Sequence, residues 1–282
     1  MNGRAGTDRT WEPPQRPWSV SMTWSHLAFL HWRIDEARLR PLIPPQLEID
    51  TFDGTAWLGV VPFLMENVRH RPLPRLPGCS TFPELNVRTY VTVDGKPGVW
   101  FFSLDAMSRL AVWAARAWFG LPYYYADMQC HADQESITYR MVRRGSRSRS
   151  PSDAPVFSSS AHWWVHPRGE AKFRARYRPT GPVYVAHPGT LDYFLTARYC
   201  LYCCDGRGQL VRSEIDHVPW PLQPAEVELE DNTVADVLGL GPLVDVPRVH
   251  FVSSIDTVAW PTEAVAAEAP ELAHLGGCTP AE

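Results

Sequence analysis

The sequence of 282 residues predicts a mainly antiparallel α+β domain with a barrel-like arrangement and a few short helices. Short segments rich in β-branched and aromatic residues recur along the chain, and turn signals such as Asp-Gly separate them. Stretches with a helical pattern are few and short. The length and the composition suggest one domain at 19–262, preceded by a flexible lead-in at 1–18 and followed by a flexible Ala/Glu/Pro-rich tail at 263–282.

The elements of the first half follow from turn and stop signals. Asp53-Gly54 marks a hairpin turn, Pro44 ends a short helix, and Asp105 can cap a helix that Gly120 and Pro122 stop. In order, we expect a strand at 22–34, a helix at 35–44, a hairpin at 47–65, a second hairpin at 83–106 and a helix at 105–119.

The second half follows the same logic. The alternation of Lys172, Arg174, Arg176 and Arg178 predicts a strand with one basic face. The Arg/Ser-rich segment 143–155 predicts a solvated loop without an evident role. In order, we expect strands at 126–132, 136–144 and 171–179, a helix at 190–198, a hairpin at 198–217, a helix at 234–240, and strands at 248–254 and 256–260.

Composition excludes several classes of function. A net charge of −4 gives no electrostatic case for binding nucleic acid or an anionic membrane. The start has no apolar core of the signal-peptide type, and no stretch approaches 18 uncharged apolar residues, so we expect a cytoplasmic protein without membrane segments. The sequence is also compatible with a homo-oligomer.

Cysteine and histidine spacing gives no metal site. Six cysteines in such a chain are expected to be reduced thiols. Cys200 and Cys203 lie on a predicted strand and would face opposite sides, so they cannot clamp one metal. His26 and His31 are five positions apart on a strand and face opposite ways as well. We therefore predict no metal and no cofactor.

The segment Pro83–Val91, PELNVRTYV, is the strongest functional signal. On a strand Glu84, Asn86, Arg88 and Tyr90 share one face, because side chains alternate. Asp94-Gly95 then signals a turn toward a return strand at 98–106. An acid, an amide and a base on so apolar a strand indicate the wall of a polar site or a solvated edge.

The loop of this hairpin decides which residues face each other. Pro97 cannot donate to a ladder, which favours a four-residue loop at 94–97 over a two-residue loop. Cross-strand partners share a face, so both loops give the same prediction. Either register is expected to place five polar side chains together: Glu84, Asn86, Arg88, Ser103 and Asp105.

Several segments together resemble a known family. They match, in order, the YqjF-like family of bacterial proteins, which is similar to a branch of the acetoacetate decarboxylase superfamily. The resemblance spans about 20–262 and rests on HLAFLHWRI, RPLIPPQLEIDTFDGTAWLGVVPF, FPELNVRTYV, VWFFSLDA and FGLPYYYA. It implies a wide antiparallel β-barrel with flanking helices around a pocket.

The resemblance also shows a departure. The decarboxylase carries a Gly-aromatic-Pro-Lys-Lys segment whose lysine forms a Schiff base, a mechanism for which the enzyme is a standard example. The matching residues here are Gly120 to Tyr124, so Tyr123 and Tyr124 stand in place of both lysines. A phenol cannot form an imine, so the decarboxylase mechanism does not carry over. Glu84 occupies the place of a pocket glutamate.

These residues suggest roles in a site for a small carboxylated metabolite. Arg88 could bind the carboxylate, Glu84 could act as general acid or base, and Tyr123 or Tyr124 could donate to an oxygen. Further contacts would come from Asn86, Ser103, Asp105 and Arg116. This predicts a lyase, hydratase or isomerase for an oxo or hydroxy acid that works without a Schiff base.

Two alternatives stay open. The polar residues could form a buried network that only stabilises the barrel, since buried charges must be paired. The barrel could also bind or sense a small molecule without catalysing a reaction.

Overall fold

The computed structural model describes residues 9–71, 80–108, 122–144, 169–205 and 208–265. Its sheet is almost entirely antiparallel, and the expected α+β class with few short helices is confirmed. Among the described helices, none is long and apolar enough to cross a membrane.

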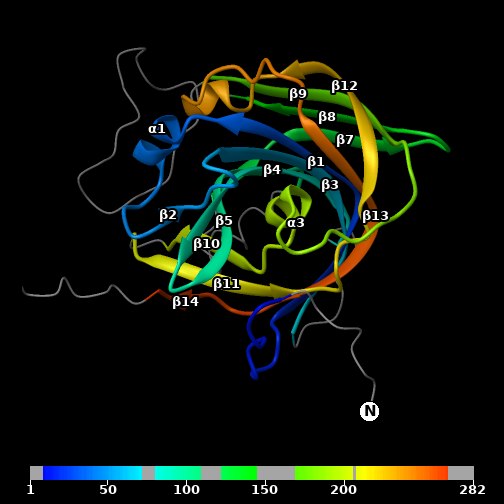
Figure 1. The fold of residues 1–282 in the computed structure, drawn as a ribbon. Helices are drawn as coiled ribbons and strands as arrows, with labels where there is room; N and C mark the ends of the chain where they lie inside the picture. Colours follow the sequence, from blue (N-terminus) through cyan, green and yellow to red (C-terminus); the bar gives the residue numbers. More distant parts are fainter. Residues whose placement is uncertain (1–8, 72–79, 109–121, 145–168, 206–207, 266–282) are drawn as a thin grey trace, which may run out of the picture.

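A closed ring of strands forms the centre of the molecule. The ring runs in the order β11-β10-β5-β4-β3-β1-β13, and β13 pairs back with β11. Figure 1 shows this ring with the short helix α3 (Leu191–Thr196) inside it. The strands of the ring are β1 (Val20–Ile34), β3 (Ala56–His70), β4 (Phe82–Val93), β5 (Lys96–Ala106), β10 (Cys200–Cys204), β11 (Leu210–Asp216) and β13 (Arg248–Ala259).

A second layer of strands covers part of the outside of the ring (Figure 1). It contains β7 (Asp127–Ala132), β8 (Ile137–Arg143), β9 (Ala171–Pro179) and β12 (Gln223–Asn232), and it joins the ring where β12 pairs with β13. The remaining short elements are α1 (Glu36–Leu39), η1 (Arg40–Leu42), β2 (Glu48–Ile49), β6 (Tyr123–Tyr125), η2 (Asp236–Leu238) and β14 (Glu263–Ala264).

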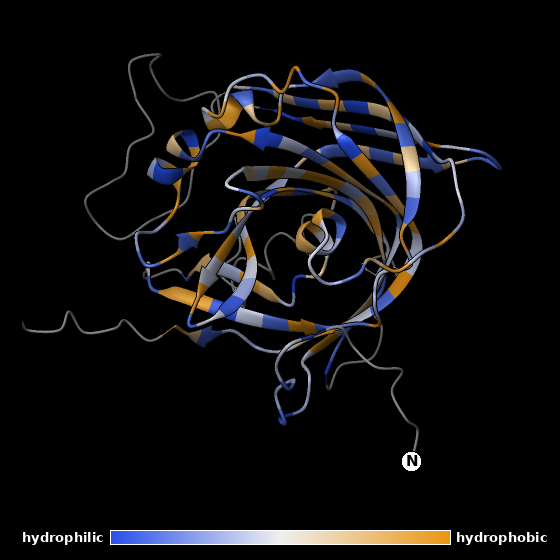
Figure 2. Cartoon of the chain, viewed as in Figure 1, coloured by the Kyte–Doolittle hydropathy of each residue, from blue (hydrophilic) through white to orange (hydrophobic). Residues whose placement is uncertain are grey.

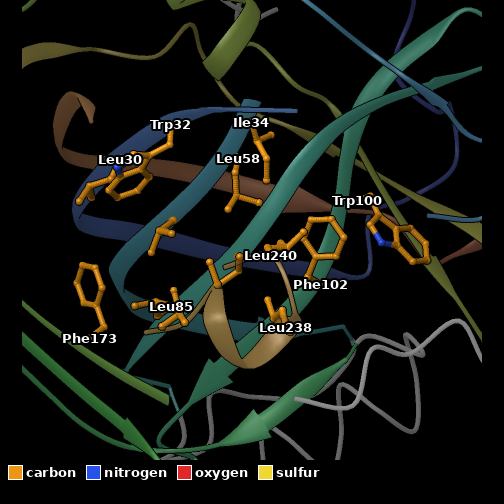
Figure 3. Packing of buried hydrophobic residues seen from close by; sticks show 14 of the residues in the cluster. Leu30, Trp32, Ile34, Leu58, Leu85, Trp100, Phe102, Phe173, Leu238 and Leu240 are labelled. Atoms are coloured by element: carbon orange, nitrogen blue, oxygen red, sulfur yellow. The ribbon is translucent and has the colours of Figure 1, made fainter. Parts of the chain in front are cut away.

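The wall of the ring separates two hydrophobic cores. The outer core lies between the ring and the second layer, where Leu85 and Phe102 of the ring pack with Phe173 of β9. Figure 3 shows Leu238 and Leu240 beside Phe102 in this core. The inner core lies inside the ring, where Leu195 of α3 packs among residues of the wall. Residues that alternate along a ring strand therefore enter different cores.

The second layer has the expected basic face. Lys172, Arg174, Arg176 and Arg178 are exposed, while the alternate residues of β9 are buried. The alternation of hydrophilic and hydrophobic residues along these strands is visible in Figure 2. The first strand, the helix at α1 and the hairpin of β10 and β11 are also confirmed.

Three local predictions were wrong. The turn at Asp53-Gly54 exists, but β2 pairs with β4 rather than with β3, so only the bridge between Phe52 and Thr55 resembles the expected hairpin. The strands predicted at 248–254 and 256–260 are one continuous strand. Asp105 lies within β5 and therefore does not cap a helix.

Two predicted features fall outside the described residues in whole or in part. The rest of the helix predicted at 105–119 lies there, as does most of the loop 143–155. Among the described cysteines, Cys130 and Cys200 are free thiols.

Candidate functional site

The hairpin of β4 and β5 is connected by a tight turn. Val93 pairs with Lys96, so the loop contains only Asp94 and Gly95. Both residues have positive φ, 52° and 67°, which is the conformation of the preferred two-residue hairpin turn. The expected four-residue loop was wrong, because Pro97 is accommodated within the strand opposite Thr92.

A β-bulge in β5 decides which side chains face the inside of the ring. Arg88 pairs with Phe101, whereas the preceding residue of β4, Val87, pairs with Ser103. Phe102 is therefore an additional residue in β5. One inserted residue moves all later side chains to the opposite face. Ser103 and Asp105 therefore lie on the outer face, and the expectation that they join Glu84, Asn86 and Arg88 was wrong.

The inner face keeps the three polar residues of β4 together. Glu84 pairs with Phe63 and Ala106, and both of these belong to the inner core. Asn86 and Arg88 follow on the same face at successive alternate positions. Glu84 and Arg88 are thus separated by about 13 Å along the strand. The inner wall has an acidic end and a basic end.

Glu84 and Tyr123 form the acidic end. The strand β6 pairs in parallel with β5 and places Tyr123 opposite Leu104, on the inner side. The Tyr123 hydroxyl donates to Oε2 of Glu84 at 3.0 Å. Burial raises the pKa of Glu84 to about 8, although the hydrogen bond from Tyr123 acts in the opposite direction. Glu84 is therefore mostly protonated at neutral pH, as a general acid must be.

Arg88 forms the basic end. Among the described residues, no carboxylate forms an ion pair with it, and its buried Nε has no hydrogen-bond partner. Its guanidinium carbon lies 5.2 Å from the ring centre of Phe29. Burial lowers the pKa of Arg88, although the nearby Tyr90 phenol favours its charge. Arg88 as a whole residue is half-buried, while its Nε atom is fully buried.

A glycine makes room beside Arg88. Gly59 of β3 pairs with Arg88 on one side and with His31 of β1 on the other. A Cβ atom at position 59 would lie 3.3 Å from Cγ of Arg88 and 3.4 Å from Cδ2 of His31. These distances are closer than ordinary contacts, so the absence of a side chain at this position allows both residues to face inward.

Two histidines that the sequence did not predict as site residues complete this end of the inner face. His31 is buried, and its Nε2 lies 2.6 Å from the Tyr90 hydroxyl, which also donates to the carbonyl of Leu195 in α3. Its ring centre lies 6.4 Å from that of His250 of β13. Burial holds the pKa of His31 well below its usual value, and the positive charge of Arg88 lowers it further.

The carboxylate of Asp192 holds His250 from the side of α3. Nε2 of His250 lies 2.9 Å from Oδ1 of Asp192, and Arg248 donates to the same oxygen at 2.6 Å. Burial would raise the pKa of Asp192, but the hydrogen bonds from His250, Arg248 and Tyr184 outweigh it and lower that pKa. The helix α3 therefore supplies an anion to the inner face.

The end of α3 is fixed by a second ion pair. Nη1 of Arg198 lies 2.6 Å from Oδ2 of Asp50, and its Nε donates to the carbonyl of Phe194. The Arg198 guanidinium also stacks near the Tyr90 and Phe194 rings. These contacts keep α3 seated within the ring.

The outer face of the hairpin carries a different cluster. Asp105 is fully buried, and its Oδ1 lies 3.1 Å from Nη1 of Arg143 in β8. Burial raises the pKa of Asp105 to about 6, although Arg143 acts in the opposite direction. Tyr124 faces this side, with the Arg143 guanidinium 4.8 Å from its ring centre. Tyr123 and Tyr124 thus belong to opposite faces.

The remaining predicted groups are placed as follows. The two lysines lie away from Glu84: Lys96 pairs with Glu214 at 2.8 Å, and Lys172 pairs with Glu170 at 2.9 Å. Arg116 lies outside the described residues. Within the described ranges, no group of three or more acidic, histidine or cysteine side chains could hold a metal ion.

The histidine pair was missed for a physical reason. His31 and His250 are more than 200 positions apart, and only the pairing of β1 with β13 brings them together. Asp192 comes from a helix inside the ring, which no periodicity in the sequence indicates. The only available signal was that His31 lies within an apolar strand.

Comparison with known proteins identifies the family. Residues 21–256 match the DUF2071 family, which is described as an uncharacterized conserved protein. The chain is 42% identical to the protein YqjF of Bacillus subtilis (strain 168) over 248 residues, which are 88% of this chain and 93% of that protein.

Solved structures show the fold. An acetoacetate decarboxylase-like enzyme from Sphingomonas wittichii RW1 aligns with a TM-score of 0.57 and 13% identity over 93% of this chain and 100% of that one. The enduracididine biosynthesis enzyme MppR, in complex with pyruvate, aligns with a TM-score of 0.54 and 15% identity over 91% and 92% of the two chains. An acetoacetate decarboxylase aligns with a TM-score of 0.51 and 14% identity over 89% and 90%. The chain therefore belongs to the DUF2071 family, has YqjF as a relative and adopts the acetoacetate decarboxylase-like fold.

Proposed function

We propose that the inner face of the ring binds a small carboxylic acid and that Glu84 and Tyr123 carry out general acid–base chemistry on it without a Schiff base. The observation that carries this proposal is Arg88. A buried guanidinium without a carboxylate partner is costly, and a ligand carboxylate would supply the missing partner through two parallel hydrogen bonds.

Neighbouring groups support the same assignment. Asn86 lies between the two ends of the inner face, and its buried Oδ1 has no hydrogen-bond partner among the described residues. A buried polar atom without a partner is costly, and a few convergent polar groups among apolar side chains are typical of binding sites. A ligand that spans from Arg88 toward Glu84 would satisfy Asn86 on the way.

The acid–base role rests on Glu84. A carboxyl group with a pKa near 8 is protonated at neutral pH and can still release its proton during a reaction. Tyr123 holds its orientation through the 3.0 Å hydrogen bond. MppR, a structural neighbour, is an enzyme in complex with pyruvate, which is a small oxo acid. An isomerase, hydratase or lyase for an oxo or hydroxy acid fits these groups.

Binding and catalysis can be tested separately. Thermal-shift and calorimetric titrations with a panel of small oxo and hydroxy acids should identify binding to the wild type. Arg88→Met should abolish this binding. Arg174→Met, on the exposed face of β9, is the matched control and should leave it unchanged. Equal binding by the Arg88 variant and the wild type would overturn the proposal.

Glu84→Gln decides between an enzyme and a binding protein. For an enzyme, this variant should bind the acid normally and lose turnover of it. A wild type that binds the acid without converting it would instead favour a binding or sensing role, which is supported by the location of both lysines away from Glu84. Borohydride treatment with oxo acids should trap no adduct on either lysine.

A further inference from the structure

The two histidines of the inner face each have one nitrogen fixed by the protein and one left over. Nε2 of His31 faces Tyr90 and Nε2 of His250 faces Asp192. Nδ1 of each ring is buried and has no hydrogen-bond partner among the described residues. Both side chains are nearly inaccessible, with 1% and 3% of their surface exposed. Such atoms lose their hydrogen bonds to water and need a replacement.

The protein contacts fix which nitrogen of His31 carries the proton. The Tyr90 hydroxyl has one hydrogen, which it donates to the Leu195 carbonyl at 2.8 Å. The hydroxyl oxygen must then accept the hydrogen of Nε2 from His31 at 2.6 Å. Nδ1 of His31 therefore presents a lone pair. The low pKa of His31 agrees with a neutral ring.

The contact with Asp192 fixes which nitrogen of His250 carries a hydrogen. The Asp192 carboxylate can only accept, so Nε2 of His250 carries the hydrogen. Arg248 forms an ion pair with the same oxygen of Asp192. In the neutral ring, Nδ1 again presents a lone pair. Its orientation by a carboxylate is the arrangement that makes a histidine an effective base.

Arg88 and the two rings belong to one neighbourhood. Arg88 and the Cδ2–Nε2 edge of His31 flank Gly59, and His250 lies beside His31. Arg88 offers only donors, whereas the two Nδ1 atoms offer only acceptors. A ligand that suits all three groups needs an anion and, next to it, a hydrogen-bond donor.

We propose that the acid bound at Arg88 is a hydroxy acid, whose hydroxyl group donates to Nδ1 of His250 or His31. This inference rests on the proposed function and specifies its ligand class. An oxo acid lacks the donor and would place a carbonyl oxygen against a lone pair. A site built to accept a hydrogen bond rejects the analogue that lacks it.

Pairs of acids with one carbon skeleton test the inference. Calorimetry should compare lactate with pyruvate and malate with oxaloacetate. In at least one pair, the wild type should bind the hydroxy acid on the order of 10-fold more tightly than the oxo acid. His250→Phe and His31→Phe should reduce this preference, whereas Arg88→Met should remove the binding of both acids.

Each outcome has a distinct meaning. Equal binding of both acids, or tighter binding of the oxo acids, would overturn the hydroxyl assignment and leave the carboxylate site standing. Binding of neither class would overturn the proposed function and this inference with it. NMR of protein labelled with nitrogen-15 histidine gives a second readout that needs no variant. It should find both rings protonated at Nε2, and hydrogen at either Nδ1 would contradict the assignment.

Discussion

The two faces of the β4–β5 hairpin carry the same three kinds of side chain in different arrangements. The outer face has Asp105, Arg143 and Tyr124, and its acid and base form an ion pair at 3.1 Å. The inner face has Glu84, Arg88 and Tyr123, but its acid and base lie four positions apart along β4.

The difference separates a structural role from a functional one. The carboxylate of the outer face has a guanidinium partner, as expected for a network that joins the second layer to the ring. The acid of the inner face is held protonated by burial, and its base has no carboxylate partner among the described residues. This difference supports the proposal that the inner face binds a ligand, while the outer face joins the second layer to the ring.

Breaking the outer ion pair should have the largest effect on stability. Asp105→Asn would leave Arg143 buried without its carboxylate, and we expect the free energy of unfolding to fall by about 3–5 kcal/mol. Urea denaturation measures this change. Adding Arg143→Met to Asp105→Asn should restore most of the loss. A single variant as stable as the wild type would show that the pair does not support the fold.

Glu84 should make stability fall as the pH rises. Its pKa is about 8 in the folded protein and about 4.3 in an unfolded chain, so the folded state holds the proton more tightly between these values. The free energy of unfolding should therefore decrease by on the order of 4 kcal/mol from about pH 4 to 8 because of this group.

Glu84→Gln should remove that part of the pH dependence and make the variant more stable than the wild type above pH 8. Asp105, with a pKa of about 6, should retain its smaller contribution between about pH 4 and 6 in both proteins. Denaturant titrations across the pH range compare them. Parallel curves for the variant and the wild type would contradict the burial of an ionisable Glu84.

Arg88 and Arg143 should respond oppositely to the same substitution. Arg143→Met removes the partner of a buried carboxylate and should destabilise the fold, whereas Arg88→Met removes a cation that has no carboxylate partner among the described residues. We expect the Arg88 variant to change the free energy of unfolding by no more than about 1 kcal/mol in the unliganded protein. A large loss of stability would assign Arg88 to the structural network instead.

The tyrosines should give the smallest effects. Tyr123→Phe removes the hydrogen bond to Glu84 and should cost about 1 kcal/mol. It should also raise the pKa of Glu84 further, because that bond favours the ionised acid. Carbon-13 NMR of the glutamate carboxyl groups follows this titration. Tyr124→Phe is the matched control on the outer face and should leave the Glu84 titration unchanged.

The sequence predicted the inner polar residues correctly but not their neighbours. The alternation along β4 placed Glu84, Asn86 and Arg88 on one face, while the sequence left Tyr123 and Tyr124 as alternative donors and the structure places Tyr123 beside Glu84. The error concerned Ser103 and Asp105. A bulge adds one residue to a strand, and the residues on either side of it keep their strand propensity. The sequence pattern of β5 alone therefore does not reveal the bulge.

Most strands could be located from the sequence, whereas their closure into a ring around α3 could not. Strand composition and turn residues located most elements of the ring, because these signals are local. The seating of α3 inside the ring depends on contacts from distant parts of the chain, such as Asp192 with His250 and Arg198 with Asp50. Residues that meet only through tertiary structure leave no spacing to detect.

The ring is not joined equally all the way around. β1 and β13 pair through eleven residues on each strand, whereas β11 with β13 and β10 with β5 are joined through only two residue pairs each. Local opening is cheapest where the fewest backbone hydrogen bonds must break. The wall should therefore part most often at one of these two short joints, and amide hydrogen exchange should be fastest there. Exchange of small molecules between the solvent and the enclosed histidines should therefore depend on the most weakly paired strands rather than on the average strand pairing of the ring.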